Sequence, residues 1–532
     1  MQGMRDRSKE TKELCPSVLH PVHRLPVEIL AEVFRLCAQS ELGNLDDLSV
    51  RKEGLFPGSL DTRKAPWVLG QICLPWRTVA LSSTGLWTRI DLSWRSTPKG
   101  FPPGRAALLE TALALQLQRC RERPITFSYR CGVESDRELK EHLALLLCSR
   151  SLQWENVLIE GEPKTFASLS RCQGLLPSLK ALHVGFLGHG WAEDGVFSAF
   201  DELPNLERFV IAGEALAVIQ RGSRFSWRTI LHYATEYDDQ WLPDLGEHYQ
   251  VLPGMRNIRT CFLHASLPGP PTTRLPIQPA LVLSFLHTLV LKEGDRLSPP
   301  AIAPLLGWLV LPALRILRFP LGFACPTALI GFLGRSRCCL EELTVLNMMD
   351  RVLTGAPLDD LLRVLEAPSL QELSTLGIGG PVSVLDDDLG DEEEPVTKDE
   401  QRDATDRILQ ALTVVDESGA NKQTLPRLLR LVLYGPRVVW TEETFLEMVS
   451  TRTRASTENR SQLKHLAVLN TGEEGEYPLR VPLTDAGANQ LRDLSRARGL
   501  AVDFSGDFCV DWSNVLEPPY PRQGSQIRSS VA

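Results

Sequence analysis

The feature that most constrains this chain is an internal repeat, in which the pattern apolar-x-x-apolar-x-apolar recurs through its central and C-terminal parts. Clear copies begin at Leu179, Leu206, Ile258, Leu286, Leu314, Leu340, Leu428 and Leu463, and weaker copies begin at Trp154, Trp227 and Leu370. Successive starts lie 21 to 35 residues apart, except for one gap of 58 that is close to two units with one copy obscured. Chance matches to a leucine-rich pattern are the alternative, but the number of copies at compatible spacing argues against them.

The spacing is close to the period of about 20 to 29 residues that leucine-rich repeats show, stretched by insertions. Several copies follow a proline, as in LPSL, LPNL, LPAL and LPRL, which fits a loop that ends just before a new strand. The usual asparagine is missing, because Met348 and Thr471 stand in its place. We therefore predict an α/β chain whose main part is an irregular leucine-rich-repeat solenoid, with short parallel strands that form a concave sheet.

In such a sheet the first, fourth and sixth pattern positions are buried, and the third, fifth and seventh face the concave side. That side is predicted to carry a mixed apolar and aromatic strip with a few cations, the composition of a protein-binding groove. Loops that cover part of the strip are the alternative for each residue. The candidate substrate-binding residues are His183, Val210, Leu231, Tyr233, Phe262, His264, Val290, Lys292, Arg318 and Tyr434.

Two amphipathic segments precede the repeats. The first, HRLPVEILAEVFRLC, places Pro26 in the first turn of a helix with one apolar face. In the second, Leu69, Ile72, Cys73, Trp76 and Val79 fit a helical face, and Trp87 to Leu92 then predicts a strand. Pro75 lacks a backbone donor and clashes with the carbonyl of Gln71, so the second helix should kink or restart there.

The residues LPVEIL-x-x-VF-x-L-C, followed by LGQIC-x-x-WR-x-VALSS, resemble the F-box of fungal F-box proteins, particularly those of mushroom-forming fungi. The resemblance continues through LLETALALQLQRCRERPITFSY and the degenerate repeats. It implies a small helical module that docks on a Skp-type subunit, and through it a cullin, while the repeats present a protein substrate. By motif position the docking module would use Leu25, Pro26, Ile29, Leu30, Phe34, Leu69, Cys73, Trp76 and Arg77. The long segment between the two helices and Pro75 depart from the family pattern.

The expected organisation has four parts. Residues 1–20 and 506–532 are predicted to be disordered ends. Residues 21–92 form the F-box-like module with an internal insertion at 39–64, and residues 93–505 form a linker helix and the solenoid. An acidic loop, 381–403, interrupts the repeats with the sequence DDDLGDEEEP.

Composition excludes several classes of function. A formal charge of -9 without a run of basic residues argues against nucleic acid, and no apolar stretch is suited to a membrane helix. No secretory signal is visible, which predicts a cytoplasmic or nuclear protein. Twelve dispersed cysteines without C-x-x-C predict no metal site. Without nucleotide, metalloprotease or hydrolase signatures, we expect no cofactor and no enzyme activity.

Three hypotheses follow. The first is a substrate-recognition adaptor of a Skp-cullin-F-box ubiquitin ligase with an unknown protein substrate. The second is a leucine-rich-repeat interaction scaffold unconnected with ubiquitin. The third is an unrecognised hydrolase or transferase that uses the loops, for which a deep pocket with mutually hydrogen-bonded titratable groups would be the structural sign.

Overall fold

The computed structural model describes the residues 25–42, 58–94, 104–131, 137–162, 167–186, 198–212, 216, 225–236, 245–265, 279–293, 302–320, 326–346, 356–379, 398–414, 424–434, 440–454, 462–469 and 483–503. The predicted disordered ends, 1–20 and 506–532, lie outside these ranges. The chain divides into two compact units, one of Met1–Leu206 with Arg221–Ser226 and one of Glu207–Gln220 with Trp227–Ala532. None of the described helices is long and apolar enough to cross a membrane.

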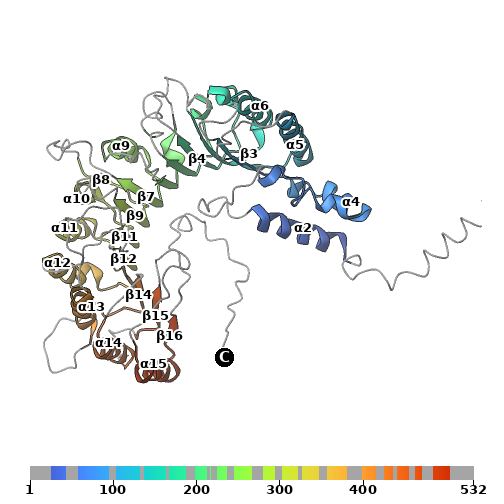
Figure 1. Cartoon of the computed structure of the whole chain (residues 1–532). Helices are drawn as coiled ribbons and strands as arrows, with labels where there is room; N and C mark the ends of the chain where they lie inside the picture. Colours follow the sequence, from blue (N-terminus) through green and yellow to red (C-terminus); the bar gives the residue numbers. More distant parts are fainter. Residues whose placement is uncertain are drawn as a thin grey trace, which may run out of the picture. The chain divides into compact units, whose positions relative to one another are not determined.

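The first unit combines the amino-terminal helices with a parallel sheet in the order β1-β2-β3-β4 (Figure 1). Its helices are α2 (Val27–Leu42), α3 (Leu69–Ile72), α4 (Leu74–Ser82), α5 (Arg105–Cys120) and α6 (Arg137–Cys148), with short 3-10 turns η2 (Gly58–Leu60), η3 (Thr84–Leu86), η4 (Ser151–Gln153), η5 (Ser168–Cys172) and η6 (Ser198–Phe200). Its strands are β1 (Arg89–Trp94), β2 (Ile125–Cys131), β3 (Trp154–Gly161) and β4 (Ala181–Phe186).

The second unit is a longer parallel sheet, with helices stacked along one of its faces (Figure 1). The strands follow chain order as β5 (Arg208–Ala212), β6 (His232–Glu236), β7 (Thr260–Ala265), β9 (Thr288–Glu293), β11 (Ile316–Pro320), β12 (Glu342–Leu346), β13 (Thr375–Gly379), β14 (Arg430–Tyr434), β15 (His465–Leu469) and β16 (Ala501–Asp503). The helices are α9 (Leu245–Val251), α10 (Ile302–Trp308), α11 (Pro326–Ser336), α12 (Ala356–Leu365), α13 (Lys398–Leu412), α14 (Glu442–Arg454) and α15 (Asp485–Arg498). The short turns η7 (Trp227–Thr229), η8 (Leu252–Gly254) and η9 (Pro368–Leu370) precede β6, β7 and β13, and β8 (Leu281–Val282) pairs with β10 (Leu309–Val310).

Strand register aligns the repeated leucines into buried rows. The fourth pattern position runs through Leu289, Leu317, Leu343, Leu376 and Leu431, which are hydrogen-bonded neighbours in successive strands and are fully buried. Full burial of one such side chain stabilises a fold by about 1.5–3 kcal/mol. The repeat therefore supplies one layer of core per unit. This mixed α/β architecture with a long parallel sheet is consistent with a repeat solenoid.

A short proline turn sets the start of several strands. In LPSL, LPNL, LPAL and LPRL the amide of the last leucine donates to the carbonyl of the first, and the proline occupies the second position, which its fixed φ favours. Asn205 and Asn257 stand just before the first pattern position and donate to the carbonyls of Pro177 and Arg228 in the preceding repeat. These side chains link neighbouring repeats in a chain that lacks the usual asparagine of leucine-rich repeats.

Several boundaries differ from the sequence prediction. β1 is the first strand of the sheet, so the predicted module 21–92 already contains one strand of that sheet. α2 continues to Leu42 and η2 begins at Gly58, which leaves less of 39–64 as insertion. α13 begins at Lys398, so 398–403 is helical and only the preceding part of the predicted acidic loop lies outside the described residues.

Two copies of the repeat pattern begin later in the structure than the sequence predicted. Tyr233 pairs with Phe209 and Leu376 pairs with Leu343, which places the first pattern positions at Ile230 and Leu373, three residues after the predicted starts. β13 pairs directly with β14, so no other strand of the sheet lies between them, and the predicted extra copy within the gap of 58 residues is not found among the described residues.

Candidate functional site

Helix α2 is apolar on two opposite faces. Leu30, Phe34 and Ala38 lie on one face and are buried. The Phe34 ring contacts the Trp76 ring of α4, with 4.9 Å between the ring centroids. This inner face attaches α2 to α4 within the first unit.

The opposite face, which we call the outer α2 face, consists of Leu25, Ile29, Val33 and Leu36. These side chains recur at intervals of four, four and three residues, so they lie along one side of the helix. They are 37%, 50%, 37% and 53% exposed. The outer α2 face is therefore an apolar surface that the described part of the chain leaves open.

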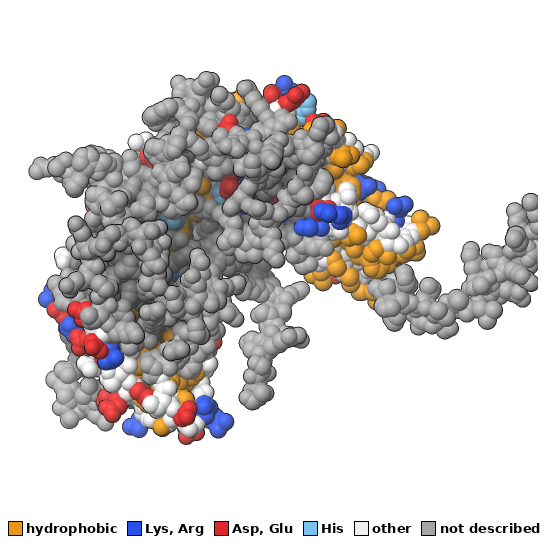
Figure 2. All heavy atoms as spheres, in the orientation of Figure 1, with side chains coloured by type: hydrophobic (Ala, Val, Ile, Leu, Met, Phe, Trp, Pro, Cys, Tyr) orange, Lys and Arg blue, Asp and Glu red, His pale blue; other side chains and the backbone are white. Residues whose placement is uncertain are grey.

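The second amphipathic segment forms two helices. α3 ends at Ile72, Cys73 is extended with φ -157°, and α4 restarts at Leu74 with Pro75 in its first turn. The sequence prediction of a kink or restart at Pro75 is confirmed. The restart leaves Ile72 and Leu74 54% and 75% exposed. Figure 2 shows hydrophobic side chains gathered over α2 and α4 on the viewed face.

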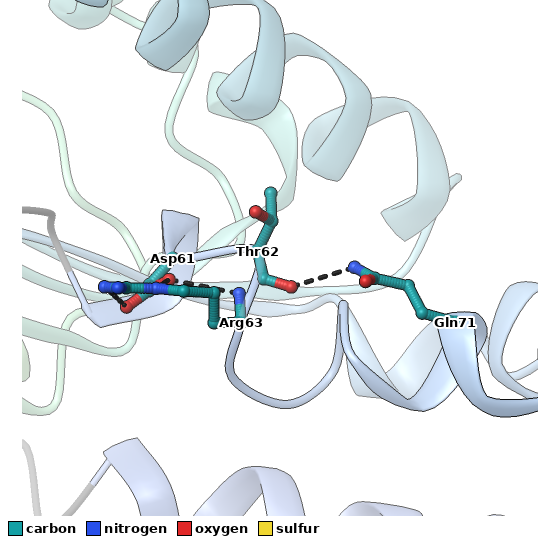
Figure 3. Close-up of polar contacts among 4 residues, drawn as sticks. All are labelled: Asp61, Thr62, Arg63 and Gln71. Carbon is teal, nitrogen blue, oxygen red and sulfur yellow. Dashed lines mark hydrogen bonds and ion pairs between the residues drawn. The ribbon is translucent and has the colours of Figure 1, made fainter.

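Polar contacts hold the turn that leads into α3 (Figure 3). The carboxylate of Asp61 accepts bonds from the backbone N–H of Arg63 at 3.0 Å and from its guanidinium at 2.9 Å. The side-chain bond to Arg63 lowers the pKa of Asp61, so the carboxylate stays charged. Gln71 on α3 donates to the carbonyl of Thr62 at 2.9 Å. These bonds fix the approach to α3, on which Leu69 is buried.

Arg77 secures the break between the two short helices. Its Nε donates to the carbonyl of Gly70 at 2.8 Å, and its own N–H donates to the carbonyl of Cys73 at 3.0 Å. The guanidinium therefore ties α4 to α3 across the extended residue. This gives Arg77 a local structural role even though its side chain is exposed.

The predicted docking residues divide into two groups. Leu30, Phe34 and Leu69 are core residues, and Cys73 and Trp76 are half-buried. Leu25, Pro26, Ile29 and Arg77 are exposed. The motif therefore specifies both the interior and the surface of the module. Val27, Leu36 and Leu74 are also exposed and were not among the predicted residues, although their place beside the motif could have indicated them.

The predicted concave strip is mostly closed over β5 to β9. Val210, Ala234, Phe262 and Val290 are neighbours in register and form one buried apolar cluster. His264 is 8% exposed, and its ring lies 5.2 Å from that of Phe262. This part of the strip consequently presents little surface to a partner.

Because the pattern at β6 starts at Ile230, two residues that were predicted to lie on the strip take other positions. Tyr233 stands in the buried fourth position and is fully buried, and Ala234 takes the strip position. Leu231 precedes the strand and leaves the strip as well. The side chain of the predicted Lys292 lies outside the described residues.

Three predicted strip residues remain partly accessible. His183 and Arg130 both contact the carboxylate of Glu160 in the first unit, at 3.4 and 3.1 Å. Arg318 pairs with Glu342 at 2.8 Å in the second unit. Tyr434 is half-buried, and burial raises the pKa of its phenol, so the ring stays neutral.

Tyr434 lies against a glycine in the strip row. A Cβ on Gly377 would come within 2.9 Å of the Tyr434 ring and of the Thr344 hydroxyl. The missing side chain at Gly377 thus lets the ring cross the sheet face. Among the residues that the structure describes, no group of three His, Cys, Asp or Glu could hold a metal ion.

No protein-family profile matches this chain, and no curated protein matches it. Among solved structures, a structural-genomics target protein from Bacteroides fragilis aligns over 62% of this chain and 66% of its own length, just under two thirds, at 12% identity and a TM-score of 0.29. A likeness at that score carries no argument about fold or function.

Proposed function

We propose that this protein is a substrate-recognition adaptor of a Skp-cullin-F-box ubiquitin ligase. The outer α2 face, with the exposed start of α4, docks on a Skp-type subunit, and the leucine-rich-repeat solenoid holds a protein substrate. The observation that carries the proposal is that α2 is apolar on two opposite faces, one of which packs against α4 while the other is left exposed by the described part of the chain.

The exposed side chains of the outer α2 face can supply the free energy of docking. Apolar burial contributes about 25 cal/mol per Å², so four half-exposed aliphatic side chains supply several kcal/mol when a partner covers them. Contiguous apolar patches on a folded surface mark protein interaction sites. The F-box-like motif in α2 to α4 supports a Skp-type subunit as that partner.

The adaptor performs no chemistry in this proposal. It binds the ligase through the amino-terminal helices and the substrate through the repeats, which raises the effective concentration of substrate lysines near the ubiquitin-loaded enzyme. The gain in rate comes from proximity, and the chain therefore requires no catalytic group of its own.

A pull-down with a purified Skp subunit tests the proposal. Ile29→Glu with Val33→Glu puts two charges on the outer α2 face without touching Leu30 or Phe34, so folding should persist. We expect at least a tenfold loss of Skp binding, since each buried unpaired charge is costly. Leu152→Glu, at a 59% exposed residue of the same unit, is the matched control and should bind normally. Undiminished binding by the double variant would refute the docking surface.

The alternative is a leucine-rich-repeat scaffold whose outer α2 face binds a protein other than Skp. The helix interruption before Pro75 favours it, because Pro75 departs from the family pattern. A folded wild-type chain that captures no Skp at micromolar concentrations would support the scaffold and exclude the adaptor.

A further inference from the structure

Two cysteines from successive repeats meet in the first unit. Cys148 ends α6, which precedes β3, and Cys172 ends η5, which precedes β4. Their side chains are hydrogen-bonded to each other. No atom separates two sulfurs that share a hydrogen, so the two thiols are direct neighbours. We call them the thiol pair.

The surrounding backbone holds the thiol pair in place. The carbonyl of Leu147 at the end of α6 accepts a bond from the indole N–H of Trp154 at 3.2 Å, and both of these side chains are fully buried. The carbonyl of Cys172 accepts a bond from the amide of Leu175 at 2.9 Å, across a turn in which Gly174 has φ +71°. Neither cysteine can therefore leave its neighbour without local opening of the first unit.

The two thiols differ in their access to solvent. Cys172 is fully buried, whereas Cys148 is half-buried. A small solute in water therefore meets the sulfur of Cys148 first, and Cys172 lies behind it. An accessible thiol with a second thiol directly beside it is the arrangement in which oxidation ends in a disulfide.

The hydrogen bond also makes one of the two protons easier to remove. The S–H of Cys148 donates to the sulfur of Cys172 and lowers the pKa of that thiol, with a smaller contribution from Ser151 and against the effect of burial. The same bond raises the pKa of Cys148. The thiol pair thus loses its first proton readily, and the remaining proton is shared between the two sulfurs. Since the thiolate is the reactive form of cysteine, the pair is more reactive than two separate buried thiols.

We propose that the thiol pair is an oxidation site, at which hydrogen peroxide converts Cys148 and Cys172 to a disulfide. The sulfur of Cys148 attacks one peroxide oxygen, the O–O bond breaks, and the other oxygen takes a proton and leaves as water. The sulfur of Cys172 then attacks the sulfenic acid at Cys148, the S–S bond forms, the S–O bond breaks, and a second water leaves. The two thiols lose two electrons and two protons in total, and one peroxide becomes two waters.

The oxidation site goes beyond the proposed adaptor function and does not depend on it. The disulfide would join two successive repeats, because α6 and η5 precede different strands. Such a crosslink restricts the opened chain and should therefore slow local opening of the first unit. In a reducing compartment a disulfide of this kind is transient, so the crosslink would last only while oxidant is present.

The test uses the folded full-length chain, treated with hydrogen peroxide, alkylated with N-ethylmaleimide and digested with trypsin. Cleavage after lysine and arginine places Cys148 in the peptide 141–150 and Cys172 in the peptide 172–180, each without another cysteine. We expect mass spectrometry to find these two peptides linked to each other, and to find them separate after reduction with dithiothreitol. Hydrogen exchange in the last turn of α6 and in η5 should be at least tenfold slower in the oxidised chain.

Two variants give the matched controls. Cys148→Ser keeps a hydrogen-bonding group beside Cys172 and should abolish the linked peptides. Cys339→Ser, at an exposed cysteine of the second unit, should leave their yield unchanged. The peroxide concentration is raised until the exposed Cys37 and Cys339 are oxidised, so that the wild-type result is decisive even if a variant fails to fold.

Three outcomes would overturn the proposal. The first is the absence of linked peptides when Cys37 and Cys339 are already oxidised. The second is linkage of Cys148 to other cysteines in the same yield as to Cys172. The third is linkage that appears only when the chain is unfolded in urea before oxidation, because the fold would then keep the two sulfurs apart.

Discussion

Arg452 on α14 is expected to hold the carboxy-terminal part of the second unit together. Its guanidinium is buried and donates to the carbonyls of Leu412, Thr424 and Leu425, the last at 2.7 Å. Leu425 opens the proline turn before β14 and has φ +49°, a conformation that a branched side chain adopts at a cost. One side chain thus links the end of α13, the turn before β14 and α14.

The perturbation is Arg452→Met, which keeps the aliphatic stem and removes the donors. A buried polar group left without a partner costs about 1–3 kcal/mol. The carbonyls of Leu412 and Thr424 lose this donor, whereas that of Leu425 keeps the bond from the Leu428 amide, so we expect a loss of about 3 kcal/mol in local stability. A change of about 1.4 kcal/mol is tenfold in an equilibrium constant, so the opening equilibrium should rise by roughly 100-fold.

Hydrogen exchange followed by mass spectrometry measures this opening. Amides of β14 and of the last turn of α13 should exchange roughly 100-fold faster, and those of β9 should not change, because each unit of a repeat array contacts only its neighbours. Arg454→Met, at an exposed residue two positions along the same helix, is the control and should change exchange by less than threefold. Unchanged exchange in β14, or an equal increase across the chain, would refute the reasoning.

Two further predictions test the corrected frame and an inter-helix contact. Tyr233 is fully buried and its hydroxyl has no partner among the described atoms, so Tyr233→Phe should leave the melting temperature unchanged or raise it. Leu231→Ala should change the melting temperature only slightly, whereas Tyr233→Ala should be strongly destabilising. If Tyr233 instead lay on the strip, Tyr233→Ala would leave the stability unchanged. Glu442 on α14 accepts bonds from the backbone and side chain of Thr484, the N-cap of α15, and these bonds lower its pKa. Because the pKa of Glu442 is lower in the folded state, its ionisation stabilises the fold above the unfolded-state pKa near 4.5, and this stabilisation is lost as the pH falls through the folded-state pKa. Hydrogen exchange in α15 should therefore accelerate below about pH 4.5 more in the wild type than in Glu442→Gln.

Sequence periodicity predicted most strand positions because two constraints coincide in each unit. The apolar pattern defines the buried side of the strand, and the proline turn defines where it begins. At Trp227 and Leu370 the pattern was predicted to start three residues too early, because a further apolar residue stands three positions before the first pattern position. Leu176, Leu203, Leu311 and Leu425 occupy that place elsewhere and are buried, so a frame three residues early also matches the pattern.

Other features could not follow from local patterns. Periodicity shows that Val210 and Phe262 face the strip side, but burial there depends on what the rest of the chain brings over the sheet. Arg452 reads as a surface residue in sequence because an arginine is rarely buried without a carboxylate. The docking motif likewise mixed inner and outer residues, since Leu30 and Ile29 are adjacent and only the three-dimensional packing separates them.

The proline turn has a consequence for how such a chain can change length. β13 and β14 pair residue for residue, although the chain between Gly379 and Arg430 is far longer than most connections in the sheet. The free-energy cost of closing a loop grows only slowly with its length. The proline turn before β14 sets the start of the strand regardless of the length of the segment that precedes it. Foreign segments grafted between Gly379 and Lys398 should therefore leave the strand alignment intact. That makes this connection a site for inserting a reporter domain, and a place where related chains can differ in length without altering their architecture.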